Sequence, residues 1–153
     1  MHSRDKGRAG SKRPVRKTAP SWIRYKSDEV ELLISKLSKE GYTHKLIHQS
    51  KEFVIAVPNK KLQKAVEFFG STSGNKVDKF KETKIKTLKS RYLKSPLIKD
   101  ATINLECKLK KEIDLGDHTM FIGEIIAAYT NPKKKRILLN MGKIKGKRVF
   151  KEF

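Results

Sequence analysis

The residues best suited to chemistry lie in one short segment, residues 70–80, with the sequence GSTSGNKVDKF. A hydroxyl group, exposed backbone amides and a lysine are the groups that bind phosphate in many loops. Ser73, Gly74 and Lys79 are therefore candidate ligands for a phosphate group. A plain connection between two helices would use similar residues, and that alternative stays open.

The same segment does not fit the P-loop of nucleotide-binding proteins. That motif needs glycine directly before its lysine, where this chain has Asn75, and a metal-binding hydroxyl where it has Val77. The loop also follows an expected helix rather than a strand. We therefore exclude a P-loop.

His118, directly after Gly116 and Asp117, is the second candidate. A histidine is suited to proton transfer or to orienting a substrate near neutral pH. A lone histidine at the start of a strand is also often structural, with its ring satisfied by a neighbour such as Asp117. Both interpretations stay open.

The other reactive side chains point to no site. His2, His44 and His48 lack the spacing and the carboxylate or thiolate partners of a metal site. Cys107 lies on the apolar side of an expected strand and is interpreted as an inert small hydrophobe. No Ser-His-Asp or Cys-His arrangement and no suitably placed carboxylate pair is evident. Any redox chemistry would have to come from a bound cofactor.

The formal net charge of +21 and the sequence pI of about 10.1 favour a polyanionic partner. Nucleic acid is the first candidate and an anionic membrane surface the second. Residues 1–20 and 131–153 supply most of the excess. The N-terminal cations are spaced by Gly, Ser and Pro and could follow an RNA backbone; they are Arg4, Lys6, Arg8, Lys12, Arg13, Arg16 and Lys17.

Residues 1–20 contain too little apolar surface to fold alone, so they are expected to be disordered when free. They also lack the apolar helical face of a mitochondrial presequence. The single cysteine fits a reducing compartment, and no apolar run is long enough to span a bilayer. The expected location is the cytoplasm.

The first half of the chain predicts mainly helices. Val30, Leu33, Ile34 and Leu37 have helical spacing after the N-cap Ser27, with Gly41 ending the helix. A second short helix is expected from His44. A buried strand over 53–57 follows, then a helix over 59–69 ending at Gly70, a loop over 71–75 and one helical turn over 76–81.

The second half predicts a β-hairpin at the centre of a sheet. Residues 103–109 alternate between apolar and polar, as in a strand with one buried face. Residues 120–129 are almost continuously apolar, as in a strand covered on both faces. The turn-forming cluster 114–117 separates them. A last strand over 137–139, a basic tail over 142–153 and a basic loop over 84–96 complete this half.

Residues 50 to 130 resemble the flavin reductase-like family. The similar motifs are KEFVIAVP, FFGSTSGNKVDKF, SPLIKDATINLEC and EIDLGDHTMFIGEI, in the family's order and spacing. The resemblance implies a split β-barrel that binds FMN and receives electrons from a reduced nicotinamide. It also implies that Ser73, Gly74 and Lys79 lie near the cofactor and that His118 is catalytic. The family's first strands have no counterpart here, although a homodimer could supply part of the missing wall.

Residues 1–47 resemble a second family, a small-subunit ribosomal protein numbered fifteen in bacteria and thirteen in eukaryotes. The opening MHSR, the SW…Y pattern and the ending KEGY carry the resemblance to its longer archaeal and eukaryotic form. The resemblance implies contact with ribosomal RNA through the basic arm. The family's helical core does not follow, so the chain joins the front of one family to the back of another. A natural fusion, an assembly artefact and an engineered chimera are all open.

These observations predict an α+β chain, a partial split β-barrel preceded by a disordered basic arm and a short helical segment. The expected division is a ribosomal-protein-like segment over 1–47 and an incomplete flavin reductase-like domain over 48–153, with about four strands and one well-formed helix. The predicted function is an FMN-binding flavin reductase-like module. The alternative is an rRNA-binding component of the ribosome.

Overall fold

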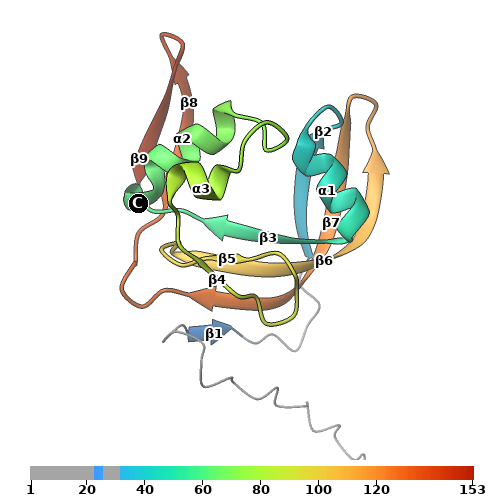
Figure 1. Cartoon of the computed structure of the whole chain (residues 1–153), viewed down its shortest axis with the longest axis horizontal. Helices are drawn as coiled ribbons and strands as arrows, with labels where there is room; N and C mark the ends of the chain where they lie inside the picture. Colours follow the sequence, from blue (N-terminus) through green and yellow to red (C-terminus); the bar gives the residue numbers. More distant parts are fainter. Residues whose placement is uncertain (1–22, 26–31) are drawn as a thin grey trace, which may run out of the picture.

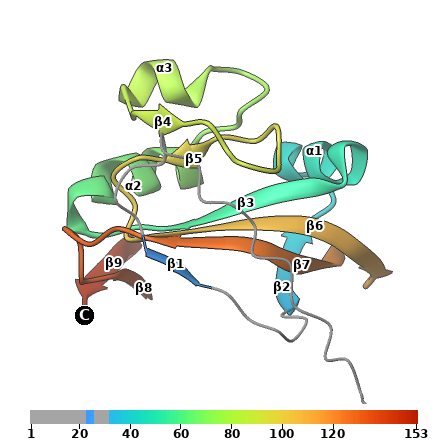
Figure 2. The same ribbon diagram turned by 90° about the horizontal axis from the view of Figure 1, so that it is seen from below.

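The computed structural model describes residues 23–25 and 32–153. The expected disorder of the basic arm and the seven cations of residues 1–20 lie outside the described residues. Within them, the chain is a curled antiparallel sheet with a helical layer on one side and a small C-terminal hairpin (Figures 1 and 2). This arrangement confirms the predicted partial split barrel.

The main sheet is built around a long hairpin, as the alternation over 103–109, the turn-forming cluster over 114–117 and the apolar run over 120–129 predict. Strand β7 pairs with β6 along one edge, and β6 pairs with β3 on its other side. The opposite edge of β7 is shared by two strands: β2 covers its first half and β1 its last three residues. The five strands are β1 (Ile23–Tyr25), β2 (Leu32–Ser38), β3 (Glu52–Val57), β6 (Ile103–Asp114) and β7 (His118–Thr130).

Two irregularities curl this sheet. The register of β6 against β7 shifts between Glu106 and Cys107 and again between Leu109 and Lys111. Bulges of this kind bend a strand and increase its twist. They also change which side of the sheet each later residue faces.

The C-terminal half of the helix predicted after Ser27 is wrong, because these residues form strand β2. Residues 32–38 pair with β7 from Leu32 opposite Glu124 to Ser38 opposite His118. The apolar positions in this stretch fit a helical face, but the unpaired edge of β7 offers seven residues of regular pairing, which local spacing does not reveal. Gly41 then becomes the N-cap of the next helix instead of ending one.

The helical layer lies on one side of the sheet, together with the short strands β4 and β5 (Figure 2). The expected helix at His44 is confirmed, although it starts two residues earlier and is preceded by Gly41 rather than capped by Thr43. The helix after Asn59 continues through Gly70, and the turn expected at 76–81 lies at 79–83. The elements are α1 (Tyr42–Ser50), η1 (Lys60–Leu62), α2 (Gln63–Ser71), α3 (Lys79–Thr83), β4 (Thr87–Leu88) and β5 (Leu97–Ile98).

The C-terminal residues form a hairpin that projects from the body (Figure 1), not the expected tail. Strand β8 (Leu138–Ile144) pairs with β9 (Lys147–Glu152). Lys145 and Gly146 between them have φ angles of 49° and 78°. Two consecutive residues with positive φ are typical of the tight turns that suit the twist of a hairpin.

Two apolar clusters lie against the sheet. The first joins Ile47 of α1 to Phe53, Cys107 and Phe121. The second joins Leu97 to Ala127 and Tyr129. Strand β7 is thus buried on both faces only near its end, at residues 127–129, whereas Met120 and Ile122 are half-buried.

Candidate functional site

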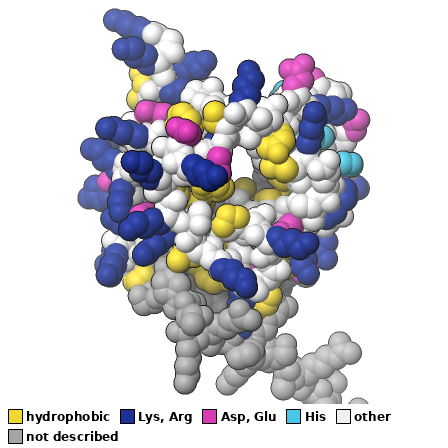
Figure 3. Space-filling model, in the orientation of Figure 1, with side chains coloured by type: hydrophobic (Ala, Val, Ile, Leu, Met, Phe, Trp, Pro, Cys, Tyr) yellow, Lys and Arg dark blue, Asp and Glu magenta, His cyan; other side chains and the backbone are white. Residues whose placement is uncertain are grey.

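A pocket of about 680 Å³ opens between helix α1 and the segment that joins α2 to α3. Figure 3 shows this face of the molecule, where the surface is hollowed and hydrophobic side chains border the hollow. Tyr42, Thr43 and Leu46 line it from α1, and Phe69 lines it from α2. The segment 74–80 forms the remaining wall. The sequence motif with the best phosphate-binding residues therefore does border a pocket.

The sequence explains why this segment is held in place. Asn59 begins the helical region, and its side-chain oxygen accepts the N–H of Lys61 at 3.1 Å. Asp78 caps α3 by accepting the N–H groups of Phe80 and Lys81 at 3.1 and 3.2 Å. The rings of Phe69 and Phe80 meet edge to face, with centroids 5.9 Å apart. These contacts fix both ends of the loop.

Gly74 stands where the loop comes closest to α1. A Cβ atom at this position would lie 3.1 Å from Cδ1 of Tyr42 and 3.8 Å from Cε of Lys79. Such a spacing is tight for any larger residue. Glycine thus permits the close approach that narrows the pocket here.

Lys79 lines the pocket, but its ammonium group is already engaged. Its Nζ donates a hydrogen bond of 2.7 Å to the carbonyl oxygen of Phe69, in the last turn of α2. It also lies 5.6 Å from the centre of the Phe69 ring. Burial lowers the pKa of this lysine. Lys79 therefore fastens α3 to α2, and its predicted contact with phosphate stays a prediction.

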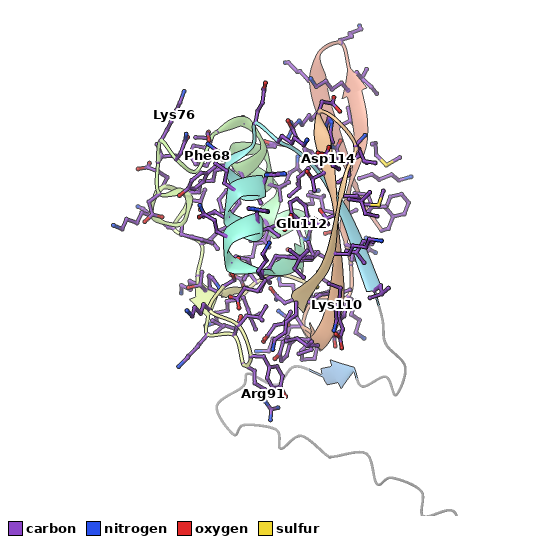
Figure 4. All side chains as sticks on the ribbon, turned by 90° about the vertical axis from the view of Figure 1, so that its right-hand side faces the viewer. Phe68, Lys76, Arg91, Lys110, Glu112 and Asp114 are labelled. Atoms are coloured by element: carbon purple, nitrogen blue, oxygen red, sulfur yellow. The ribbon has the colours of Figure 1, made fainter. Side chains whose placement is uncertain are left out.

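Lys76 is a pocket residue that the sequence motif did not single out. It is exposed, lines the same pocket, and has no ion pair with any described residue. Figure 4 shows it at the outer end of the helical layer, far from the sheet. Its place two residues after Gly74 was the available signal. Ser73, by contrast, does not line the pocket; its carbonyl oxygen accepts the N–H of Lys76 at 3.2 Å.

His118 lies apart from this loop. It begins β7, opposite Ser38 of β2, and does not line the pocket. Its Nδ1 is 2.9 Å from Oδ1 of Asp117, and this neighbour holds the pKa of the aspartate below its usual value. Asp117 is the neighbour that the structural interpretation named, but this buried nitrogen has no hydrogen-bond partner among the described residues, so that interpretation also stays a prediction. The catalytic interpretation stays a prediction.

The residue after His118 faces α1 instead. Oγ1 of Thr119 lies 2.8 Å from Nε2 of His44. One turn further along α1, Nδ1 of His48 lies 2.8 Å from a carboxylate oxygen of Glu112 (Figure 4). Lys51 donates to the other oxygen of Glu112 at 2.9 Å. These contacts bind α1 to the β6–β7 hairpin and so position one wall of the pocket.

Two carboxylates that hold the basic loop over 84–96 were missed by the sequence reasoning. Glu106 is 0 % exposed and accepts the N–H groups of Arg91 and Tyr92 at 2.7 and 2.8 Å and the Tyr129 hydroxyl at 2.8 Å. Glu52 similarly accepts the N–H of Lys94 at 2.7 Å. Both fasten the basic loop over 84–96 onto the sheet. No local signal marked Glu106, because it occupies a polar position of an alternating strand, where exposure is expected.

The described residues contain no group of three or more His, Cys, Asp or Glu side chains that could hold a metal ion. Every helix in the same part of the chain is too short or too polar to span a bilayer.

Comparison with known proteins identifies the family. The model of the flavin reductase like domain matches residues 14–146. The chain belongs to the flavin reductase-like family. An uncharacterized protein of Archaeoglobus fulgidus is 39 % identical over 118 residues, which cover 77 % of this chain and 66 % of that protein. A ferric-chelate reductase (NAD(P)H) of the same organism is 34 % identical over 96 residues, covering 60 % and 54 %.

Solved structures of flavin reductase-like proteins have the same fold. A flavoredoxin from Methanosarcina acetivorans superposes with a TM-score of 0.70 at 24 % identity, covering 86 % of this chain and 73 % of its own. An NADH:FAD oxidoreductase of Streptomyces globisporus superposes with a TM-score of 0.61 at 27 % identity, covering 68 % and 61 %. The chain spans 66 % or less of the curated relatives named above.

The second predicted resemblance is confirmed over a short part of the chain. The small ribosomal subunit protein uS15 of Picrophilus torridus is 47 % identical over 47 residues, which cover 31 % of this chain and 32 % of that protein. The family match begins at residue 14, before the expected division at residue 47. That division stays a prediction.

Proposed function

We propose that this chain binds FMN in the pocket between α1 and the segment 74–80, as a module that transfers electrons from a reduced nicotinamide to the flavin. The supporting observation is that three large apolar side chains around this pocket are exposed to solvent. Tyr42, Leu46 and Phe80 are 37 %, 45 % and 39 % exposed. Apolar surface gathered at one concave site is typical of a binding site for a flat, largely apolar ligand.

The lining residues fit a flavin in two ways. The side chains of Tyr42, Phe69 and Phe80 offer aromatic contacts for the ring system. Lys76 offers an exposed ammonium group in this lining, whereas the ammonium of Lys79 is held by the Phe69 carbonyl. FMN is preferred to FAD because its terminal phosphate suits such an exposed cation at one end of an apolar pocket. Once bound, the flavin supplies the redox chemistry, and the protein's part is to hold and orient it.

Two further roles belong to this proposal. Ser73 and Gly74 would hold the phosphate end, Gly74 through its backbone; Ser73 lies outside the lining, so its role requires a phosphate that extends past the pocket. His118 would orient the nicotinamide, and because it lies outside the lining, this role requires a ligand that extends beyond the pocket or a second copy of the chain. We place the module in the cytoplasm, where reduced nicotinamides are available, and propose a homodimer.

Flavin fluorescence quenching tests the proposal, with FMN, FAD and riboflavin titrated separately. Lys76→Ala is expected to weaken FMN binding by about 1–2 kcal/mol, because a charge-assisted contact is lost, and to leave riboflavin unchanged. Tyr42→Ala should weaken all three flavins. Lys89→Ala, which removes an exposed lysine that lines no described pocket, is the matched control. Absence of quenching at high protein concentration would overturn the proposal.

A second candidate function is binding of ribosomal RNA through the N-terminal arm. The similarity to protein uS15 supports it. Deleting residues 1–20 removes seven cations, of which about four or five could contact phosphates together. Each contact contributes about 0.7–0.9 to the slope of log affinity against log salt, so the slope should fall by about three to four. Fluorescence anisotropy with a ribosomal RNA fragment measures it. An unchanged slope would exclude the arm as an RNA ligand.

A further inference from the structure

A second depression, separate from the flavin pocket, lies between α2 and the β4–β5 region. Its volume is about 530 Å³, and it shares no lining residue with the pocket described above. The floor is apolar and includes Leu62, Ala65, Phe68 and Ile85. Five lysines line the same depression, which we call the basic cleft: Lys61, Lys64, Lys84, Lys86 and Lys99.

A smaller depression of about 320 Å³ continues the basic cleft. The two share Lys61. The smaller one adds Lys60 and the four consecutive cations of residues 133–136. Figure 3 shows Lys and Arg side chains gathered over the side of the molecule where α2 and α3 lie. A continuous positive surface thus joins segments far apart in the sequence.

Few carboxylates offset this charge. Asp100 pairs with Lys61 at 3.0 Å, and Glu152 accepts the backbone N–H of Lys60 at 2.9 Å. Lys64, Lys84, Lys86 and Lys99 have no ion pair within 4.0 Å among the described residues. Gathered like charges repel one another and destabilise the fold. A bound polyanion would remove that cost and release its own counterions.

The backbone holds several of these lysines in fixed positions. The N–H of Lys99 donates to the carbonyl oxygen of Lys86 at 2.9 Å, which fastens the two segments together. Lys84 ends α3 with a φ of 52°, and its N–H donates to the carbonyl oxygen of Lys81. Cations on a fixed backbone lose less entropy on binding than cations on a flexible tail.

We propose that the basic cleft binds single-stranded nucleic acid, with phosphates on the lysines and an unpaired base on the apolar floor beside Phe68. The concave shape favours a strand over a membrane, because a flat lipid surface cannot reach the floor. The apolar floor favours an unpaired base over a duplex, whose bases are enclosed. An aromatic ring beneath a positively charged rim is the arrangement that binds single strands without sequence preference. This site is independent of the flavin pocket and of residues 1–20.

The test is fluorescence anisotropy of the full chain with a labelled single-stranded RNA, over a salt series. The cleft variant is Lys84→Glu, Lys86→Glu and Lys99→Glu together. The control is Lys143→Glu, Lys145→Glu and Lys147→Glu on the β8–β9 hairpin. Both triple variants reverse three exposed lysines, and each includes one lysine with a left-handed backbone, since φ is 52° at Lys84 and 49° at Lys145.

The cleft variant is expected to lower the salt slope by about two, at about 0.7 per lost contact to a single strand, and to weaken binding at least about tenfold. The control should change the slope by less than one. Equal losses of affinity in both variants would show that binding depends on the net charge of the chain and not on the basic cleft, and would overturn the proposal. Thermal unfolding and FMN titration of the cleft variant show whether it is folded. If it is not, the triple Lys→Gln variant at the same positions replaces it.

Phe68→Leu tests the floor separately, because it keeps the apolar volume and removes the aromatic face. Loss of the stacking contact with one base should weaken the binding of single-stranded RNA at least about fivefold and leave the binding of heparin unchanged. Duplex RNA of equal length and vesicles containing phosphatidylglycerol are the alternative partners. Cleft-dependent binding of vesicles, or of the duplex as tightly as the single strand, would contradict the proposal.

Discussion

Replacing Glu106 with alanine should be among the most destabilising single changes in the described part of the chain. The carboxylate is 0 % exposed and accepts three hydrogen bonds, from the N–H groups of Arg91 and Tyr92 and from the Tyr129 hydroxyl. It is the acceptor through which the loop over 84–96 is fastened to β6. Alanine removes all three bonds and leaves a cavity in the same place.

The expected cost follows from these contacts. A hydrogen bond to a charged group contributes about 1.5–3 kcal/mol, and buried donors that lose their acceptor add a desolvation penalty. Contacts that share one carboxylate are not additive. We therefore expect a loss of about 3–5 kcal/mol, a large part of the stability of an ordinary domain. For a chain of this length, that corresponds to a fall in Tm of about 10 °C. Glu106→Gln keeps one carbonyl oxygen and should cost about 1–3 kcal/mol.

Urea unfolding measures the loss, and hydrogen exchange locates it. The amides of Arg91 and Tyr92 should lose protection first, because their acceptor is gone. Glu82→Gln, a change at an exposed glutamate in α3, is the control and should alter stability by less than about 0.5 kcal/mol. The reasoning is wrong if the free energy of unfolding of Glu106→Ala lies within about 1 kcal/mol of that of the unsubstituted chain, or if the amides of Arg91 and Tyr92 stay protected. Other contacts would then hold the loop.

Three other perturbations test the fold. A Cβ on Gly123 would lie 2.5 Å from Cζ of Phe53, so Gly123→Ala should cost about 1–3 kcal/mol in thermal unfolding, and Phe53→Leu in the same chain should recover part of it. Lys51 and His48 lower the pKa of Glu112. This stabilisation is present at neutral pH and lost as pH falls through the lowered pKa. Glu112→Gln should therefore destabilise by at most about 1 kcal/mol at pH 7, and the effect should shrink as pH falls through the lowered pKa of Glu112. An effect that does not change with pH would refute the ion pair. Burial and the nearby Glu106 raise the pKa of Cys107 to about 12, so its thiol should react with iodoacetamide only as fast as the chain unfolds.

The centre of the sheet was predictable because its signal is local. Alternation over 103–109 and the turn-forming cluster before His118 specify a hairpin without reference to the rest of the chain. The caps at Asn59 and Asp78 are local as well. Asn59 marked the start of the helical region correctly, and the turn expected at 76–81 lay only a few residues from α3.

The C-terminal hairpin and the role of Glu106 were missed, for different reasons. The β8–β9 hairpin follows a run of lysines, and charge dominated the interpretation of residues 142–153 as a tail. Gly146, a residue that favours tight turns with positive φ, was the overlooked local signal. Glu106 could not be found this way, since a charged residue at a buried position becomes comprehensible only when the loop that covers it is known.

The candidate site was predictable as a segment and not as a set of side-chain roles. The family motif indicated residues 73–80, and the seven consecutive residues from 74 to 80 do line one pocket. The lysine that could contact a ligand there is set by the carbonyl group of Phe69. This group accepts a hydrogen bond from the ammonium of Lys79, whereas Lys76 is exposed. That choice is made by tertiary contacts between α2 and α3, on which the motif spacing carries no information.

The edge of β7 opposite β6 connects the two family resemblances physically. Residues 23–25 and 32–38 fall in the segment similar to the ribosomal protein family, and both pair with that edge. A long strand with an unpaired edge presents a row of backbone donors and acceptors, which bind whatever extended segment reaches them. The family match begins at residue 14, so both strands also lie within the matched domain. The apolar residues at 33, 34 and 37 suit a helix against a helical core and a strand against a sheet edge about equally. The available partner therefore decides their conformation, and here that partner is β7.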